Sequence, residues 1–123
     1  MLHHIIERDA LSKVVLCTAT GVLSVKTALQ ISQANLLAYD LGYSLIYDVS
    51  RTRLVASIVE AYEFVRDRTA LFGDPTHIPK KIAVVRSPGN DEFWEFYQTT
   101  ALNAGLPVQV FDFMEVARDW CMD

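Results

Sequence analysis

Cysteine is scarce in this chain, and long hydrophobic runs are missing. The 123 residues include two cysteines, Cys17 and Cys121, which lie far apart and form no CxxC motif. This pattern predicts free thiols in a reducing cytoplasm, with Cys17 buried inside a strand. No apolar segment approaches the roughly 20 residues that cross a bilayer, and the N-terminus lacks the pattern of a signal peptide. We therefore expect a cytoplasmic protein without a transmembrane segment.

The chain also lacks an excess of positive charge. Its net charge is −4, and the acidic excess lies in residues 62–123. A nucleic-acid-binding protein normally carries a basic stripe, so this class of partner is not expected. Apolar residues make up 51% of the chain, which suits one compact domain over residues 1–123.

Recognisable catalytic motifs are missing as well. The sequence contains no GxSxG, no HExxH, no glycine-rich phosphate loop and no metal-ligand spacing. Histidines are few, and the adjacent His3 and His4 would point to opposite faces of a strand. We therefore predict no catalytic residue, no metal site and no cofactor.

The stretch Ser44–Ser50 is apolar on both of its faces, which is typical of a central parallel strand that is covered on both sides. Further strands are predicted at His3–Glu7, Val14–Thr20, Ile82–Val85 and Val108–Phe111. Only the first connection is as short as a hairpin, so the first two strands are predicted to be antiparallel and the others parallel.

Amphipathic patterns predict helices at Ser24–Tyr39, Arg53–Thr69 and Asp91–Ala104, and a short last helix after Asp112. Ser24 is the expected N-cap of the first helix, and Asp112 with Glu115 has the spacing of a capping box for the last. The order β-β-α-β-α-β-α-β-α predicts an α/β sandwich, in which about four helices pack on a mixed, mostly parallel five-stranded sheet.

The apolar faces of two helices follow from the same spacing. In the second helix, the residues expected to face the sheet are Val55, Ile58, Val59, Tyr62 and Val65. In the last helix, they are Phe113, Val116, Ala117 and Trp120.

The order of these elements and several segments resemble the STAS (SpoIIAA-like) domains and their SEC14-like bacterial branch. Val14–Leu23 is similar to the family's strand that ends in a Gly-x-Leu turn, and Leu45–Ser50 is similar to its central strand. Ile82–Val85 and the segment from Val110 to Trp120 resemble the SEC14-like branch. The resemblance covers almost the whole chain and implies a two-layer sandwich.

That resemblance implies a non-catalytic regulatory or protein-interaction domain, with a protein partner or a second copy of the chain as its partner. The SEC14-like branch implies an alternative, which is a small carrier or sensor of an apolar, lipid-like or anionic ligand. A carrier needs an enclosed apolar pocket of ~300 Å³ or more. An enzyme of unrecognised type is the third alternative.

Ser57 is the serine nearest to the position that is phosphorylated in STAS antagonists of anti-sigma factors. The family motif there is Asp-Ser-Ser-Gly, but Ala56 precedes Ser57 and Ile58 follows it. The helical pattern also places Ser57 a full turn inside the second predicted helix. We therefore predict that Ser57 is not a working phosphosite, and that Ser57→Asp lowers stability because it adds charge beside a packed face.

Polar residues follow two neighbouring strands where helices are predicted to begin. Hydroxyl groups, cations and a helix N-terminus together can bind an anion or a partner at the carboxyl edge of the sheet. The residues of this predicted edge are Asp48, Ser50, Arg51, Arg53, Arg86 and Ser87. The alternative is structural: Asp48 accepts hydrogen bonds from the turn or pairs with an arginine, and the arginines are solvated.

The third predicted helix carries four aromatic residues within five positions. Phe93 and Tyr97 share one face, whereas Trp94 and Phe96 fall on opposite flanks of it. One interpretation is that these rings cover the rim of the sheet. The other is that Trp94 or Phe96 is exposed and forms an interface, either with a partner or in a homodimer.

Overall fold

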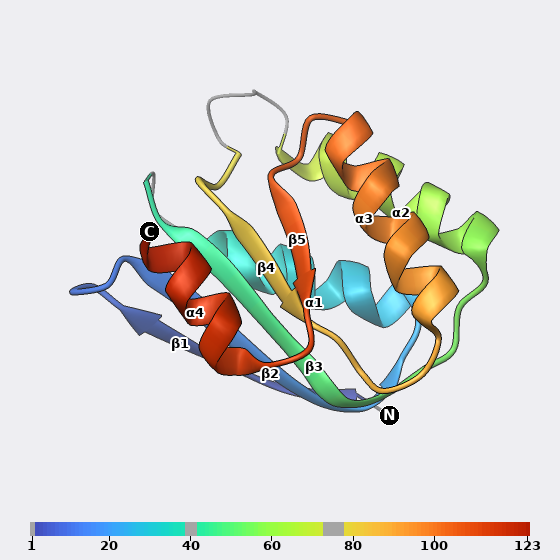
Figure 1. Cartoon of the computed structure of the whole chain (residues 1–123), viewed down its shortest axis with the longest axis horizontal. Helices are drawn as coiled ribbons and strands as arrows, with labels where there is room; N and C mark the ends of the chain where they lie inside the picture. The colour runs from blue at the N-terminus through green and yellow to red at the C-terminus, as the bar shows by residue number, and fades with distance from the viewer. Residues whose placement is uncertain (1, 39–41, 73–77) are drawn as a thin grey trace.

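The computed structural model describes residues 2–38, 42–72 and 78–123 as five strands and four helices (Figure 1). In chain order the elements are β1 (Leu2–Asp9), β2 (Val14–Leu23), α1 (Val25–Ala38), β3 (Ser44–Leu54), α2 (Ile58–Phe72), β4 (Ile82–Val85), α3 (Asp91–Asn103), β5 (Val108–Phe111) and α4 (Met114–Met122). This is the predicted order of elements, and Tyr39, the predicted end of the first helix, lies outside the described residues.

The strands form one sheet in the order β1-β2-β3-β4-β5, so β3 is central, as the sequence predicts. β1 pairs antiparallel with β2, and the other pairs are parallel. The hairpin between β1 and β2 is stabilised by Asp9, whose Oδ1 accepts hydrogen bonds from the backbone N–H groups of Leu11 and Ser12. The predicted mixed, mostly parallel α/β sandwich is confirmed.

The two faces of β3 are buried under different helices (Figure 1). Leu45 points into the larger core with α1, α2 and α3, where it joins Phe64 of α2 and Trp94 of α3. Its neighbour Ile46 points to the opposite face, where α4 packs and contributes Ala117. Because successive side chains of a strand point to opposite faces, a strand covered on both sides has to be apolar at consecutive positions.

The boundary between β3 and α2 differs from the prediction. A helix over Arg53–Thr69 is wrong, because β3 continues to Leu54 and its residues 51–54 pair with residues 20–23 of β2. The register shifts between Thr18 and Thr20, where β3 has one extra residue and forms a bulge. Thr52 on this extension is buried, and its hydroxyl donates to the Val49 carbonyl. Strand pairing therefore overrides the helical pattern here.

α2 consequently begins five residues later than predicted, and its buried face is different. Ala61, Phe64, Val65 and Arg68 lie against the sheet. Three of the residues assigned to the buried face, namely Val55, Val59 and Tyr62, are exposed instead.

α4 differs from its prediction in the same way. Its N-cap is Phe113, which makes no capping side-chain hydrogen bond, so the predicted capping box of Asp112 and Glu115 is wrong. Phe113 and Val116 are exposed, whereas Ala117 and Cys121 face the sheet.

Both cysteines are buried and free. Burial raises the pKa of the Cys17 thiol, and also that of the Cys121 thiol, to about 11. The thiols are therefore protonated at neutral pH and poor nucleophiles. In the described part of the chain, no helix is both long and apolar enough to cross a membrane.

Candidate functional site

The residues predicted to follow the central strand do not meet a helix N-terminus. Ser50, Arg51 and Arg53 all lie within β3, where the two arginines are exposed. Asp48 is half-buried, and its Oδ1 accepts hydrogen bonds from the backbone N–H of Ser50 at 3.1 Å and from the Ser50 hydroxyl at 2.6 Å. This carboxylate therefore stabilises the bulged strand. Of the two structural roles considered for Asp48, it accepts local hydrogen bonds.

In the second half of the predicted edge, Arg86 is committed to structural contacts and Ser87 is buried. The Arg86 guanidinium donates to Asp112 at 2.6 Å and to Asp91 at 2.7 Å, and these contacts raise its pKa. Two carboxylates thus surround its single charge. Ser87 is buried, and its hydroxyl has no hydrogen-bond partner among the described residues. The geometry on which the predicted anion edge relied is therefore not formed.

The aromatic residues of α3 divide between core and surface. Trp94 is buried and packs edge-on against Phe93 and Tyr97, with ring centroids 5.1 Å and 6.0 Å away. Trp94 as an exposed interface residue is therefore wrong. Phe96 is 37% exposed, so it is the one of the two residues that remains available for an interface.

Ser57 lies at the start of α2 and not inside the helix. Its backbone N–H donates to the Glu60 carboxylate at 2.9 Å, and its hydroxyl accepts from the Glu60 N–H at 3.2 Å. This reciprocal pair is a capping box, and Ser57 is exposed. The prediction that Ser57 is not a working phosphosite now rests only on Ala56 and Ile58, which depart from the family motif.

The capping box changes the expected effect of substituting Ser57. Ser57→Ala removes the cap, and we expect it to lower the free energy of unfolding by about 1 kcal/mol. Ser57→Asp supplies another good N-cap and a negative charge at the helix N-terminus, so we expect it to stay within about 0.5 kcal/mol of the wild type. Urea unfolding of the two variants measures this difference. Equal losses for both would show that the cap is not what stabilises the start of α2.

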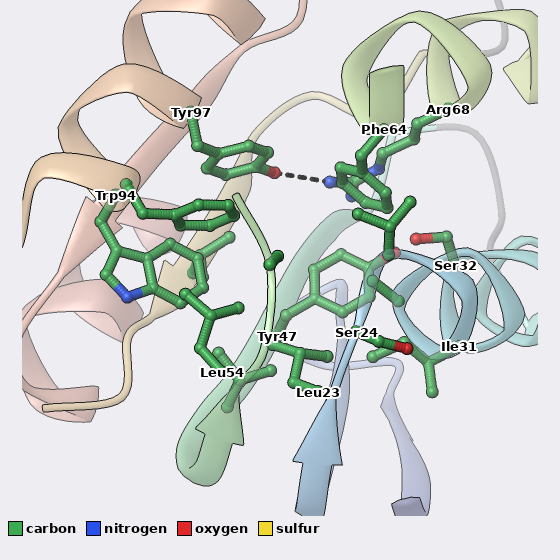
Figure 2. A pocket seen from close by; sticks show the side chains of 16 residues that line it. Leu23, Ser24, Ile31, Ser32, Tyr47, Leu54, Phe64, Arg68, Trp94 and Tyr97 are labelled. Atoms are coloured by element: carbon green, nitrogen blue, oxygen red, sulfur yellow. Dashed lines mark hydrogen bonds between the residues drawn. The ribbon is translucent and has the colours of Figure 1, made fainter. Parts of the chain in front are cut away.

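A cavity lies between the sheet and helices α1, α2 and α3 (Figure 2). Its walls are mainly apolar and come from six elements, namely β2, β3, β4, α1, α2 and α3; they include Leu23, Ile31, Leu54, Phe64 and Trp94. The volume is about 60 Å³, well below the ~300 Å³ of a pocket that encloses a drug-sized ligand. The cavity therefore suits a small group rather than the whole body of a lipid.

One charged side chain, Arg68 of α2, lines this apolar cavity. The residue is only 2% exposed. Its Nη1 donates to the Tyr97 hydroxyl at 2.8 Å, and its guanidinium carbon lies 4.8 Å from the centre of the Tyr47 ring (Figure 2). Its Nε and Nη2 are buried without a hydrogen-bond partner in the described part of the chain. None of the ion pairs found there includes Arg68.

The Arg68 charge is not balanced by its neighbours. Burial lowers the pKa of the guanidinium, but the phenols of Tyr97 and Tyr47 raise it by more, so it stays charged at neutral pH. Burial raises the pKa of Tyr97 despite the nearby cation, so this phenol stays neutral. A desolvated cation–π contact contributes about 2 kcal/mol of stabilisation. The desolvation penalty of an unpaired buried ion is larger, on the order of several kcal/mol. The arrangement is costly unless an anion joins it.

The sequence analysis did not identify Arg68 as a candidate residue. A signal was present, however. Arg68 follows Phe64 by four residues and Val65 by three, which places it on the same helix face as Ala61. A charge in the middle of an otherwise apolar face is a reason to expect a buried polar site.

A second candidate is an exposed apolar strip at the start of α2, which we call the α2 surface. It consists of Val55, which lies in the connection between β3 and α2, and of Val59 and Tyr62 on the helix; these side chains are 47%, 68% and 56% exposed. Tyr62 also lines an open groove between α2 and α3, together with Thr69 and Asn103. Val59 and Tyr62 are three residues apart and therefore share one face of the helix. Exposed apolar residues that share a face are typical of binding surfaces. Within the described ranges, no three His, Cys, Asp or Glu side chains are grouped as a metal site would require.

Comparisons with known proteins relate the chain to others by its fold. No family model matches the sequence, and no curated protein matches it. An anti-sigma factor antagonist from Mycobacterium paratuberculosis superposes with a TM-score of 0.62 at 17% identity, covering 100% of this chain and 96% of that one. An uncharacterised DUF3478-family protein with a SpoIIAA-like fold, from Shewanella loihica, superposes with a TM-score of 0.56 at 17% identity. The match covers 98% of this chain and 93% of that one.

The chain therefore has the STAS/SpoIIAA-like fold, which confirms the resemblance at the level of the fold. At this identity the comparison does not extend to a function or a ligand. Both neighbours match over nearly their whole length, so the likeness extends over the whole fold.

Proposed function

We propose that this chain is a non-catalytic regulatory domain that acts by binding a protein partner through the α2 surface. The observation that carries the proposal is the exposure of Val55, Val59 and Tyr62, which the amphipathic pattern would otherwise place in the core. Leaving these side chains in water forgoes the free energy of their burial, and a partner that covers them recovers it.

Two further features support a protein partner at this surface. Charged groups, including Glu63 and Arg66, are exposed beside the strip, so an apolar centre has a polar rim, as in protein interfaces. The Mycobacterium paratuberculosis protein of the same fold is an antagonist of an anti-sigma factor, which means that it acts on another protein. α4 also exposes apolar residues, but Tyr62 adjoins a groove that a partner side chain could fill.

Substitution of Val59 tests this proposal. We expect Val59→Glu to reduce recovery of the partner at least about tenfold, because a central apolar contact is replaced by a charge that must be desolvated. The measurement is co-purification of tagged protein from the cells that produce it naturally, quantified by mass spectrometry, with urea unfolding of each variant.

Val116→Glu is the matched control, because Val116 is a helical valine of similar exposure, 51%, on the opposite side of the sheet. It should fold and retain the partner. Loss of the partner in both variants, or in neither, would contradict binding through the α2 surface. If the recovered protein is a second copy of this chain, the interface is that of a homodimer.

A further inference from the structure

We propose that the cavity beneath α1, α2 and α3 binds an apolar monocarboxylate, and that Arg68 holds its carboxylate group. This inference goes beyond the protein-binding function, because it concerns a different surface and a different class of ligand. It rests on the unpaired guanidinium and on the shape and chemistry of the cavity.

The free atoms of Arg68 are the ones that recognise a carboxylate. A guanidinium presents its Nε–H and one terminal N–H side by side, as a fork that donates two parallel hydrogen bonds. In Arg68, Nη1 is used by Tyr97, whereas Nε and Nη2 have no partner among the described residues. The tyrosine contact thus fixes one edge of the guanidinium and leaves the edge that fits a planar, two-oxygen anion.

The rest of the cavity selects against other anions. Among the described residues that line it, Arg68 is the only cation, so a single negative charge is neutralised and a second is not. The other described lining residues with polar side-chain groups are Ser24, Ser32, Tyr47 and Tyr97, which carry hydroxyls, and Trp94, which carries an indole N–H. The remaining walls are apolar, and they disfavour a strongly hydrated ion such as phosphate.

The orientation of the ligand follows from the placement of the residues. In Figure 2, Leu23 and Leu54 lie at the carboxyl ends of β2 and β3, and Arg68 lies away from them, beside Phe64 and Ser32. A carboxylate at Arg68 would therefore direct its apolar tail along the cavity towards that edge. Nε and Nη2 are closed to solvent, so the carboxylate reaches them when a neighbouring side chain such as Tyr47 or Phe64 turns aside.

The binding test uses hexanoate, with hexan-1-ol as its uncharged counterpart and inorganic phosphate as an anion without a tail. Isothermal titration calorimetry at neutral pH measures the affinities of the full chain. We expect hexanoate to bind at least about tenfold more tightly than hexan-1-ol, because only the carboxylate pairs with the guanidinium. We expect no binding of phosphate in the same range.

The two tryptophans locate the ligand within the same sample. Trp94 lines the cavity, and its indole N–H has no hydrogen-bond partner in the described structure, whereas Trp120 packs on Phe111 on the opposite face of the sheet. We expect hexanoate to shift the ¹⁵N–¹H signal of the Trp94 indole and to leave that of Trp120 unchanged. Trp120→Phe assigns the two signals.

A double variant tests the role of Arg68 itself. Arg68→Met with Tyr97→Phe removes both members of the hydrogen bond, so the Tyr97 hydroxyl is not left buried without its partner. We expect it to lose hexanoate binding and to unfold at or above the wild-type temperature, since a buried unpaired charge is replaced by an apolar side chain. Arg68→Lys keeps the charge but not the fork, and should bind more weakly than the wild type.

Three results would overturn the proposal. These are no binding of hexanoate at millimolar concentration, equal binding of hexanoate and either hexan-1-ol or phosphate, and unchanged binding in the double variant. A double variant that unfolds well below the wild type would assign Arg68 a structural role instead. Each of these readouts is independent of the α2 surface.

Discussion

Leu45→Ala is expected to lower the free energy of unfolding by about 3 kcal/mol. Leu45 lies on the central strand and is fully buried in the larger core, where the side chains of three helices meet the sheet. Truncation removes buried methyl groups and leaves a cavity that neighbours from separate elements cannot easily fill. The free energy is measured by urea unfolding monitored by circular dichroism.

Leu102→Ala is the matched control for this substitution. Leu102 lies on α3 and is 52% exposed, and alanine is the better helix former, so we expect a change of about 0.5 kcal/mol or less. Similar losses in the two variants would contradict the central position of β3.

Phe111→Ala is also expected to lower the free energy of unfolding by about 3 kcal/mol, because it truncates a side chain in the core on the opposite face of the sheet. Phe111 is the last residue of β5 and is buried in the smaller core, with its ring 5.5 Å from that of Trp120 on α4. Without this ring α4 loses an anchor on the sheet, so hydrogen exchange of its amides should accelerate by more than that of α2.

Phe113→Ala provides the comparison, because Phe113 lies two residues further along the chain and is 70% exposed. We expect this variant to retain wild-type stability to within about 0.5 kcal/mol. If Phe113→Ala were the more damaging change, α4 would pack through the face that the sequence predicts and not through the one described above.

The sheet could be predicted because its signals are local and strong. The run from Leu45 to Val49 is apolar on both faces, and only a strand covered on both sides places such residues favourably. The single short connection after Asp9 likewise fixes the one antiparallel pair. The sequence does not reveal that α4 takes the face opposite to the other helices, because its pattern is apolar on two sides.

The helix faces could not be predicted as reliably, since periodicity identifies an apolar stripe but not whether anything covers it. For α2 the stripe of Val55, Val59 and Tyr62 is exposed, and the covered face includes Arg68. The pairing of residues 51–54 with β2 moves the helix start, and this change also moves Ser57 to the N-cap. Long-range strand pairing is therefore the cause of both wrong predictions, the start of α2 and the position of Ser57 within it.

The candidate site was even less accessible to sequence reasoning. The residues that line the cavity come from β2, β3, β4 and three helices, and they have no shared motif. The predicted edge is not formed for a related reason, because the charge of Arg86 pairs with Asp91, the first residue of α3, and with Asp112, which follows β5. Such partners are visible only once the chain is folded.

Site-specific photo-crosslinking tests the proposed function most directly. A photoreactive benzoylphenylalanine replaces Val59 on the α2 surface in one variant and Val116 on α4 in another, and both are irradiated in the cells that produce the protein. We expect the Val59 position to give one dominant protein adduct and the Val116 position to give none. Adducts of equal yield at both positions, or none at Val59, would contradict a regulatory partner bound at the α2 surface.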